Sequence, residues 1–418
     1  KMTDLPLNGI RVVDLSRVFA MPYAGAYLAD LGAEVIKVDC CQAQFVDTTR
    51  TLNGPYPDND PGELYWERAG TFQTLNRGKR SITLDLRSGD AIGILKQLVS
   101  VSDIVLENFT PRVMQRFGLD YANLRAVKPD LIMVSNTGYG HSLPWSNFAS
   151  MATALQPSHG TGAFMGYLDP GPYGRPHDGG IPNKMGNSYT DFLASWTAQL
   201  AVIASLIHRS RTGKGMWVDL AMYQVGSSFI GEGILDFAFN GRRTRRMGNR
   251  DHTMSPHGCY PCLGQDEWVT IAVRDDRDWE ACCQALGQPS LAGDSRFAHP
   301  TDRHGHQDEL DEIISRWTST QSQYQIMEAL QSAGVPAGPV LNAKALLADP
   351  QYRARGFFQP ADHADETGLG RKEYVGRGWS LSESLINPIR PAPMLGEAND
   401  YVLSRMLCLN DEEIQRLK

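Results

Sequence analysis

The chain has 418 residues, of which 42% are hydrophobic and 21% charged, and its formal net charge is −7. This length exceeds that of a common single domain, and the composition excludes a disordered or collagen-like chain. The acidic balance argues against nucleic-acid binding, which usually needs a basic face. No long uninterrupted apolar stretch is present, so we expect no transmembrane helix and no membrane partner. Seven cysteines, an odd number, favour free thiols in a reducing, cytoplasmic compartment.

The first third of the chain predicts a parallel sheet with helices on both faces. The strands are short apolar runs, and the helices carry apolar residues on one side. Because the two alternate, the connections are expected to be right-handed crossovers of an α/β domain. The strands are expected at 10–15, 33–39, 81–86, 103–107 and 131–135, and the helices at 23–31, 88–99 and 112–117.

Two stretches interrupt this pattern. Residues 47–69 and 138–187 are rich in turn-forming residues and are predicted to be long irregular excursions, which are usually functional. Between the second stretch and a strand at 216–220, a helix is predicted over 189–210. Its apolar residues lie nearly all round, so we expect it to be buried.

The sequence changes character after about residue 222. A strand pair at 260–273 and helices at 277–286, 307–318 and 322–332 predict a smaller α+β domain. The tail is expected to be loop-rich with a short final helix at 411–417. The predicted division is therefore a large domain over 1–222, a small domain over 223–339 and a C-terminal part over 340–418.

Several phrases that occur in order along the chain resemble the class III CoA-transferase family. This family includes formyl-CoA transferase, carnitine CoA-transferase and α-methylacyl-CoA racemase. The resemblance implies a large Rossmann-like domain built from both chain ends, to which 340–418 returns, and two chains interlocked as a dimer. The phrases occupy 7–15, 28–38, 76–86, 107–109, 211–215, 334–340 and 391–397.

The resemblance also implies the nucleophile. In the transferases it is an aspartate at the start of the long apolar helix, about twenty residues before an Arg-Thr-Gly-Lys-Gly turn, and here that position is Asp191. A carboxylate attacks the thioester, and a helix N-terminus keeps it ionised. Residues 188–191 also fit a capping box, and Asp169, in an Asp-Pro-Gly turn, is a rival carboxylate.

Coenzyme A contacts implied by the resemblance mostly follow predicted strands, where α/β sheets bind ligands. For the charged residues among them, a solvated surface or a dimer contact is the alternative, and Lys79 and Arg80 are further candidates. The implied contacts are Val18, Phe19 and Ala20 at the thioester end, Leu84 and Arg87 near the nucleotide, Arg116 on a phosphate, and two further strips against coenzyme A, Asn108, Phe109 and Thr110 and then Asn136, Thr137, Gly138 and Tyr139.

Some positions depart from the family pattern. Cys40, Phe19, Thr137 and Gly140 replace polar or charged groups of formyl-CoA transferase, its Gly-rich loop has no clear copy at 247–258, and Ser195 stands where the family often has Gly. These changes favour a larger, less polar acid over formate or oxalate. Succinyl-CoA is the donor implied by its wide use in the family.

Two other functions stay open at this stage. The related racemases pair the aspartate with a His in a Gly-His-Asp phrase, where this chain has Met151, and His141 or His159 could replace that His only by a shifted alignment. Some members of the family are catalytically silent subunits, so a heteromer with a paralogous chain is the alternative to a homodimer.

The remaining motifs favour plain structural roles. Cys259 and Cys262 form a Cys-x-x-Cys, but the sequence offers no well-spaced further ligands, and their role is left open. The basic run 242–246 is typical of a solvated linker, a dimer contact or a phosphate contact. We therefore expect no metal and no tightly bound cofactor, with acyl-CoA and a carboxylic acid as substrates.

Overall fold

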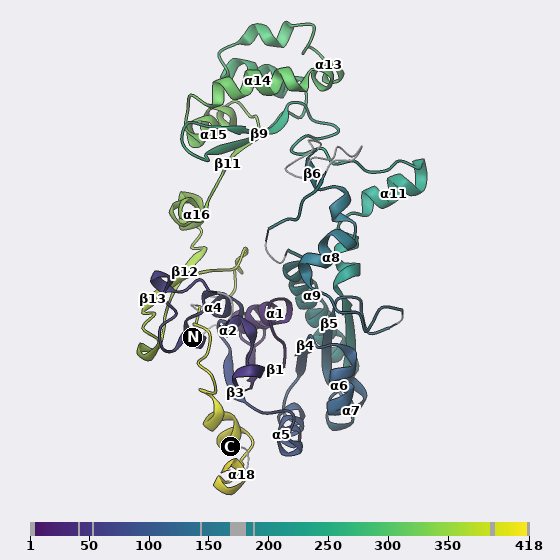
Figure 1. Cartoon of the computed structure of the whole chain (residues 1–418), viewed down its shortest axis with the longest axis vertical. Coiled ribbons are helices and arrows are strands. Elements are labelled where there is room, and N and C mark those ends of the chain that lie inside the picture. The colour runs from purple at the N-terminus through teal and green to yellow at the C-terminus, as the bar shows by residue number, and fades with distance from the viewer. Residues whose placement is uncertain are drawn as a thin grey trace. The chain divides into compact units, whose positions relative to one another are not determined.

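The computed structural model describes residues 5–40, 42–51, 54–142, 144–167, 181–186, 189–384 and 389–415 (Figure 1). These residues form two compact units. Unit 1 comprises Lys1–Gly162, Lys184–Arg243 and Arg353–Lys418, and unit 2 comprises Ala163–Asn183 and Thr244–Tyr352. Unit 1 thus takes its chain from both ends of the sequence. The division at 222/223 and 339/340, with its assigned functions, stays a prediction.

Unit 1 is built on a six-stranded parallel sheet, which confirms the predicted α/β fold. The strand order is β3-β2-β1-β4-β5-β8, so the direction of the winding reverses between β1 and β4. Ligands of such sheets bind at this reversal, outside the carboxyl ends of the strands. The strands are β1 (Arg11–Asp14), β2 (Glu34–Asp39), β3 (Arg80–Thr83), β4 (Ile104–Glu107), β5 (Ile132–Thr137) and β8 (Met216–Ala221).

Alternating strand residues divide the core into two layers. Val12 and Val35 pack with α1 (Ala20–Asp30) and α9 (Tyr189–Thr212), whereas their neighbours Val13 and Ile36 face the opposite layer. Because both faces are covered, the strands read as continuous apolar runs. The opposite layer contains α5 (Gly89–Ser100), α6 (Pro111–Phe117) and α7 (Tyr121–Val127), the last of which the sequence did not predict.

The two stretches predicted to be irregular contain short helices. In the first, Arg50 is fully buried and pairs with Glu67 (2.7 Å) and Asp39 (3.1 Å), and these distant partners fix the local turns. The first stretch contains α2 (Thr48–Thr51) and α3 (Tyr65–Arg68) and is followed by α4 (Gly70–Asn76). The second contains α8 (Ala152–Ser158), η3 (Thr161–Ala163), β6 (Gly166–Tyr167) and β7 (Ile181–Pro182).

Helix α9 is only partly buried, so the prediction of a buried helix holds for one side of it and is wrong for the other. One side packs against α1, α8, α10 (Met222–Ser228) and β5, while Trp196 and Leu200 on the other side are 52% and 71% exposed. By length and composition alone α9 could cross a membrane. Hydrophobicity shows which side chains favour burial but not which neighbours they find, and within the described ranges the neighbours of α9 pack on one side of it.

Unit 2 contains an antiparallel sheet of order β11-β10-β9. Its helices pack on one face around the buried Trp279 and Phe297. The strands are β9 (His257–Pro261), β10 (Trp268–Ala272) and β11 (Ala337–Val340), and the helices α12 (Asp276–Ala285), α13 (Pro300–Gly305), α14 (Gln307–Thr318) and α15 (Gln323–Ser332).

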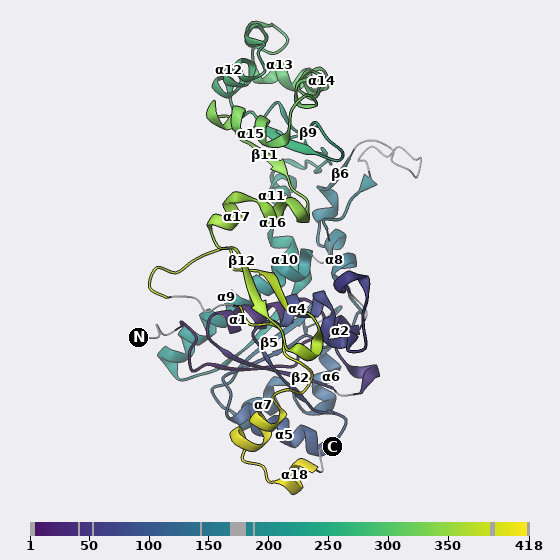
Figure 2. The ribbon, with the colours of Figure 1, turned by 90° about the vertical axis from the view of Figure 1, so that its left-hand side faces the viewer.

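The tail has more structure than predicted, because a hairpin of β12 (Phe358–Asp362) and β13 (Arg371–Val375) and the helices α16 (Ala343–Ala348) and α17 (Pro350–Ala354) lie in it. Its last part returns to the edge strand β3, where the Ser81 carbonyl accepts from the Ala398 N–H (2.9 Å). Figure 2 shows this yellow segment beside α5, ending in α18 (Asp411–Gln415).

Candidate active site

Two cavities of unit 1 open at the carboxyl edge of the parallel sheet. The larger, here the α9 cavity, has a volume of about 700 Å³ and is lined from the loops after β1, β4 and β5 and from α4, α8 and α9. The smaller, here the α6 cavity, has about 280 Å³ and is lined from the ends of β1, β2 and β3 and from α6. Both lie where the fold predicts a ligand.

The loop after β1 is tied to the end of β4 by Asn108. The Asn108 oxygen accepts from the Arg17 N–H (2.9 Å), and the Asn108 amide donates to the Arg17 carbonyl (2.7 Å). Val18, the next residue, has φ of +69°, a strained conformation for a β-branched residue that costs about 1–3 kcal/mol. Such strain is typical of a site whose backbone geometry matters.

A buried ion pair supports the strained residue. The Asp47 carboxylate accepts from the Val18 N–H (3.3 Å) and pairs with Lys37 (3.1 Å), whose ammonium also donates to the Ser16 carbonyl (2.9 Å). Burial opposes ionisation of Asp47, but Lys37 and the Thr49 hydrogen bonds hold the Asp47 pKa below its usual value. The pair therefore stays charged and fixes the loop that borders both cavities.

Asp191 stands in the first turn of α9 and lines the α9 cavity, half-buried. Neighbouring side chains of the same turn fix it to α1. Phe192 packs edge-on against Tyr23, with ring centroids 5.0 Å apart, and the Ser195 hydroxyl donates to the Ala20 carbonyl. The N–H groups and dipole of a first helical turn favour a carboxylate and can stabilise a developing oxyanion.

Glu107, the last residue of β4 and the neighbour of Asn108, has a fully buried carboxyl group. It accepts from the Phe109 N–H (2.8 Å), and His141, paired with Asp219 (3.0 Å), lies 3.8 Å away. Burial, with some help from the Asp219 charge, raises the Glu107 pKa to about 7, although a Ser135 hydrogen bond opposes the rise. In the sequence Glu107 stands out only as part of a family phrase, and neither its raised pKa nor its burial could be predicted.

The structure brings most of the predicted contacts into the two cavities. Ala20, Thr110 and Tyr139 line neither: Ala20 is buried at the start of α1, Thr110 is the N-cap of α6, and Tyr139 contacts Tyr223. The α9 cavity contains Val18, Phe19, Asn108, Asn136, Thr137, Gly138 and Asp191, and the α6 cavity contains Leu84, Arg87, Phe109 and Arg116.

Of the further candidates from the sequence, two are paired within the fold and two lie wholly or partly outside the described residues. Lys79 is buried against Asp14 (2.6 Å), and Arg80 lies beside Glu34 (3.4 Å), so both side chains are engaged within the fold. Asp169 and the Ser188 end of the capping box lie outside the described residues. The sequence analysis missed the cavity walls from α4, which follows the first excursion, and from α8, whose only signal was the unusual length of the second. These walls contribute Thr71, Ala152, Thr153 and Leu155.

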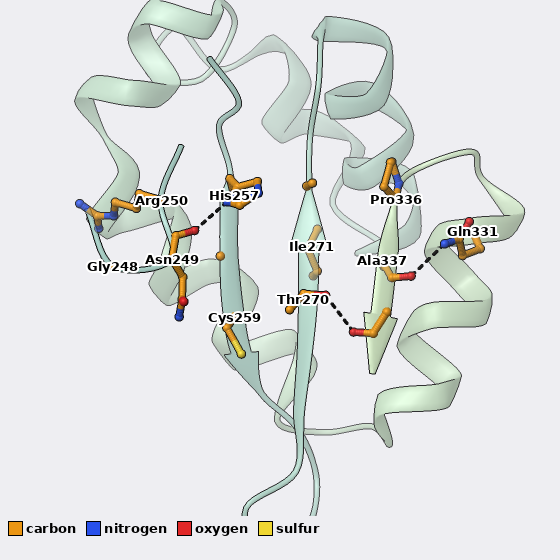
Figure 3. Close-up of a pocket in the computed structure, with 13 residues that line it drawn as sticks. Gly248, Asn249, Arg250, His257, Cys259, Thr270, Ile271, Gln331, Pro336 and Ala337 are labelled. Atoms are coloured by element: carbon orange, nitrogen blue, oxygen red, sulfur yellow. Dashed lines mark hydrogen bonds between the residues drawn. The ribbon is translucent and has the colours of Figure 1, made fainter. Parts of the chain in front are cut away.

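Unit 2 has a cavity of its own, of about 570 Å³, over the open face of its sheet (Figure 3). In Figure 3, His257 bonds the Asn249 carbonyl (2.6 Å), and Cys259 points from β9 into this space. Cys262, by contrast, packs in the core of unit 2. The two thiols thus face different surroundings, and burial raises both pKa values, which argues against joint redox chemistry. In the described part of the chain, no cluster of His, Cys, Asp or Glu has the makings of a metal site.

A doubly wound sheet with ligand-sized cavities at its switch point, one of them holding a carboxylate at a helix N-terminus, defines an α/β enzyme. The comparison with known sequences specifies the class further. The chain belongs to CoA-transferase family III, which matches residues 7–399, and it is a CoA-transferase. This confirms the resemblance and the activity that it implied.

Two relatives and one solved structure match over nearly their whole length. The chain is 34% identical to the succinate–glutarate CoA-transferase of Agrobacterium fabrum, over 97% of this chain and 98% of the relative. It is 32% identical to the succinyl-CoA–D-citramalate CoA-transferase of Chloroflexus aurantiacus, over 99% and 97%. The crystal structure of a CAIB/BAIF family protein from Brucella suis superposes with a TM-score of 0.83 at 31% identity, over 96% of this chain and 100% of that one.

Proposed function

We propose that this CoA-transferase acts through Asp191 as a covalent nucleophile. One observation carries the proposal: among the described residues that line the α9 cavity, Asp191 is the one carboxylate. Its place in the first turn of α9 sets it against the positive end of the helix dipole, which favours the carboxylate form that a nucleophile requires. The neutral amides and hydroxyls around it can orient a thioester without neutralising it.

The first half of the reaction loads CoA onto the enzyme. An Asp191 oxygen attacks the thioester carbonyl of the donor, the C–S bond breaks, and CoA leaves as a thiolate, giving an acyl–aspartyl anhydride. The thiolate then attacks the Asp191 carbonyl carbon, which releases the donor acid as a carboxylate. The product is an aspartyl-CoA thioester.

The second half reverses these steps with a different acid. The acceptor carboxylate attacks the aspartyl thioester and expels CoA thiolate, forming a second anhydride. The thiolate attacks the acceptor carbonyl, yielding acceptor-CoA and the original Asp191 carboxylate. No proton or water is consumed, and water must be kept out because it would hydrolyse both anhydrides.

The two cavities suit the two ends of coenzyme A. Arg87, which pairs with Asp85 (2.6 Å) in the same cavity wall, and Arg116 line the α6 cavity beside the apolar Leu84 and Phe109. Two guanidinium groups beside apolar side chains suit a phosphorylated nucleotide. The α9 cavity, with Asp191, would take the thioester. Asn108 and Phe109, adjacent in sequence, line one cavity each, so the pantetheine arm would cross the sheet edge at the switch point.

The names of the relatives support succinyl-CoA as donor, since those from Chloroflexus aurantiacus and Haloarcula hispanica are named as succinyl-CoA transferases. For the acceptor we propose a carboxylic acid larger and less polar than formate or oxalate. Met151, Leu155 and Met222 in the wall of the α9 cavity support this choice.

A racemase would need a second acid–base group across the cavity from Asp191. Met151 lines the cavity where the related racemases carry His, and it cannot transfer a proton. His141 is held by Asp219, and His159 is buried against Thr190 (3.2 Å). These contacts favour the transferase over the racemase.

We further propose a homodimer in the cytoplasm. Trp196, Leu200, Ile203 and Ile207, here the α9 stripe, recur at spacings of four, three and four along α9, the pattern of a helix–helix seam. A second copy would cover it. A paralogous chain is the alternative, since a relative is named as the alpha subunit of a succinyl-CoA–L-malate CoA-transferase. The free thiols of the cysteines in the described ranges support the location.

Trapping of the intermediate tests the proposal. The enzyme is mixed with succinyl-CoA and a panel of acids, turnover is followed by mass spectrometry, and hydroxylamine is added to convert an aspartyl thioester into a hydroxamate. We expect the hydroxamate at Asp191, no turnover in Asp191→Asn or Asp191→Ala, and normal turnover in the matched Asp120→Asn, at an exposed N-cap of α7. Undiminished transfer by both Asp191 variants would overturn the assignment.

A further inference from the structure

His159, at the end of α8, makes a contact that the reaction scheme does not use. Its side chain is buried, with 2% of the residue exposed, and its Nε2 lies 3.2 Å from the Thr190 hydroxyl. Thr190 immediately precedes Asp191 in the first turn of α9 and is itself fully buried. Breaking this hydrogen bond would leave two buried polar groups without partners, which costs free energy. The bond therefore holds Thr190 against His159.

The backbone of α10 fixes where the imidazole can lie. A Cβ built on Gly226 would come within 2.2 Å of Cδ2 of His159, so only glycine leaves room for the ring. The Ser227 hydroxyl, next along α10, donates to the His159 carbonyl (3.1 Å). His159 is thus held by α10 at its carbonyl and along its ring, and by α9 at its Nε2.

A second contact from α8 holds the chain just ahead of α9. With the Gln156 carboxamide oriented to suit its neighbours, its oxygen accepts from the Met185 N–H (2.7 Å) and its nitrogen donates to the Met185 carbonyl (3.3 Å). Gln156 is buried, at 3% exposure. We call the pairs Gln156–Met185 and His159–Thr190 the α8 clamp, because they grip the chain on both sides of the entry to α9.

The hydrogen-bond direction follows from the other ring nitrogen. Nδ1 of His159 is buried and has no hydrogen-bond partner within the described ranges. If Nδ1 carried the proton, a buried N–H would be left without an acceptor, whereas a proton on Nε2 leaves only a lone pair of Nδ1 unpaired. The second arrangement costs less, so we assign the proton to Nε2, which then donates to the Thr190 hydroxyl. Burial lowers the His159 pKa, which agrees with a neutral ring.

We propose that His159 is a positioning residue of CoA transfer, which holds Thr190 and thereby aims Asp191 into the α9 cavity. This inference rests on the proposed role of Asp191. Successive side chains project about 100° apart around a helix. With Thr190 held against α8 and Phe192 packed against Tyr23, the direction left to Asp191 is the cavity. A displacement of about 1 Å at a reacting group can cost up to about 100-fold in rate.

Paired variants test the contact. Thr190→Val and His159→Leu remove it at nearly constant volume, while Thr190→Ser and His159→Gln keep a hydroxyl and an N–H donor. Thr197→Val makes the same change on α9, where the Thr197 hydroxyl bonds only the Leu193 carbonyl of its own helix (2.8 Å). Turnover is measured with the best donor–acceptor pair of the acid panel, and single-turnover trapping gives both the rate constant and the amplitude of hydroxamate formation.

We expect Thr190→Val and His159→Leu to lower kcat and the trapping rate constant by about tenfold or more, with KM for acyl-CoA within about twofold and full amplitude. Thr190→Ser, His159→Gln and Thr197→Val should stay near the wild-type rate. Gly226→Ala should act like His159→Leu, and adding His159→Ala to it should relieve the clash, so that the double variant is no worse than His159→Ala alone.

The outcomes separate this inference from the proposed function. If Thr190→Val and His159→Leu keep the wild-type rate constant, or lose amplitude alone as a misfolded fraction would, the positioning role is refuted while Asp191 stands. If Asp191→Asn also transfers CoA normally, the proposed function fails first. Thermal unfolding of each variant shows what share of any loss is stability.

Discussion

The carboxamide of Asn108 bonds both the N–H and the carbonyl of Arg17, so that one side chain joins the ends of β4 and β1 across the switch point of the sheet. Both polar atoms of the amide are used, because the oxygen accepts while the nitrogen donates. The strained Val18 follows directly, and it lines the α9 cavity as Asn108 does. The geometry of this edge therefore depends on a group that Asp or Ala cannot replace.

We expect Asn108→Asp to weaken acyl-CoA binding. The new carboxylate cannot donate to the Arg17 carbonyl and repels it, which should lower the binding free energy of acyl-CoA by about 1–2 kcal/mol. Since about 1.4 kcal/mol is tenfold in affinity, KM for acyl-CoA should rise about tenfold. Steady-state kinetics checks this, with Asn123→Asp on the exposed face of α7 as the matched control. An unchanged KM in Asn108→Asp would show that the tie between β1 and β4 is dispensable.

The sequence predicted the elements whose cause is local. Buried parallel strands such as β2 and β5 are continuous apolar runs, and α5 has one apolar side, so periodicity was enough. It failed where the cause lies far along the chain. Helix α2 depends on Arg50, whose partners include the Pro393 carbonyl (3.2 Å).

The residues of the site also fall into those that the sequence could predict and those that it could not. Asn108 was predicted from the family phrase that contains it and Asp191 from its distance to the phrase at 211–215, and the structure brings both to one cavity. The wall from α8 and its contact to Thr190 could not be predicted, because a lone His before a Gly carries no signal of what it touches. The exposed side of α9 was missed for a different reason: hydrophobicity shows that a face will be covered but not whether the same chain covers it.

The pH dependence of stability should carry the signature of Glu107. Burial raises its pKa to about 7 from an ordinary 4.5, so the folded protein keeps a proton that the unfolded chain releases between these values. The free energy of unfolding therefore falls as the pH rises from 4.5 towards 7, by about 3 kcal/mol at most, and this contribution is constant above 7.

Glu107→Gln should remove that decline, because a neutral carboxamide keeps an acceptor for the Phe109 N–H without ionising. Urea unfolding at pH 5 and pH 8 measures it, with Glu232→Gln on the exposed side of α11 (Gly231–Asn240) as the control. The variant should be the more stable protein at pH 8. Parallel pH profiles for the wild type and Glu107→Gln would contradict the buried, protonated carboxyl.

Ser195 is expected to stabilise the packing of α9 on α1. Its hydroxyl donates to the Ala20 carbonyl and is fully buried, so Ser195→Ala should cost about 1 kcal/mol of unfolding free energy, and Ser195→Gly about 1 kcal/mol more from helix propensity. Ser205→Ala is the control, since the Ser205 hydroxyl bonds only the Ala201 carbonyl of the same helix (2.7 Å). Equal losses in Ser195→Ala and Ser205→Ala would mean that the contact between helices adds nothing.

The α9 stripe predicts a change of assembly when a charge is placed in it. Leu200 is 71% exposed in the single chain, so Leu200→Asp should leave the fold of unit 1 intact, yet it would bury a charge wherever a second copy covers α9. Light scattering should then report a dimer for the wild type and a monomer for the variant. Val101→Asp, at another exposed apolar residue (43%), should remain dimeric. A wild-type monomer, or a Leu200→Asp protein that is still a dimer, would exclude the α9 stripe as the seam between two copies.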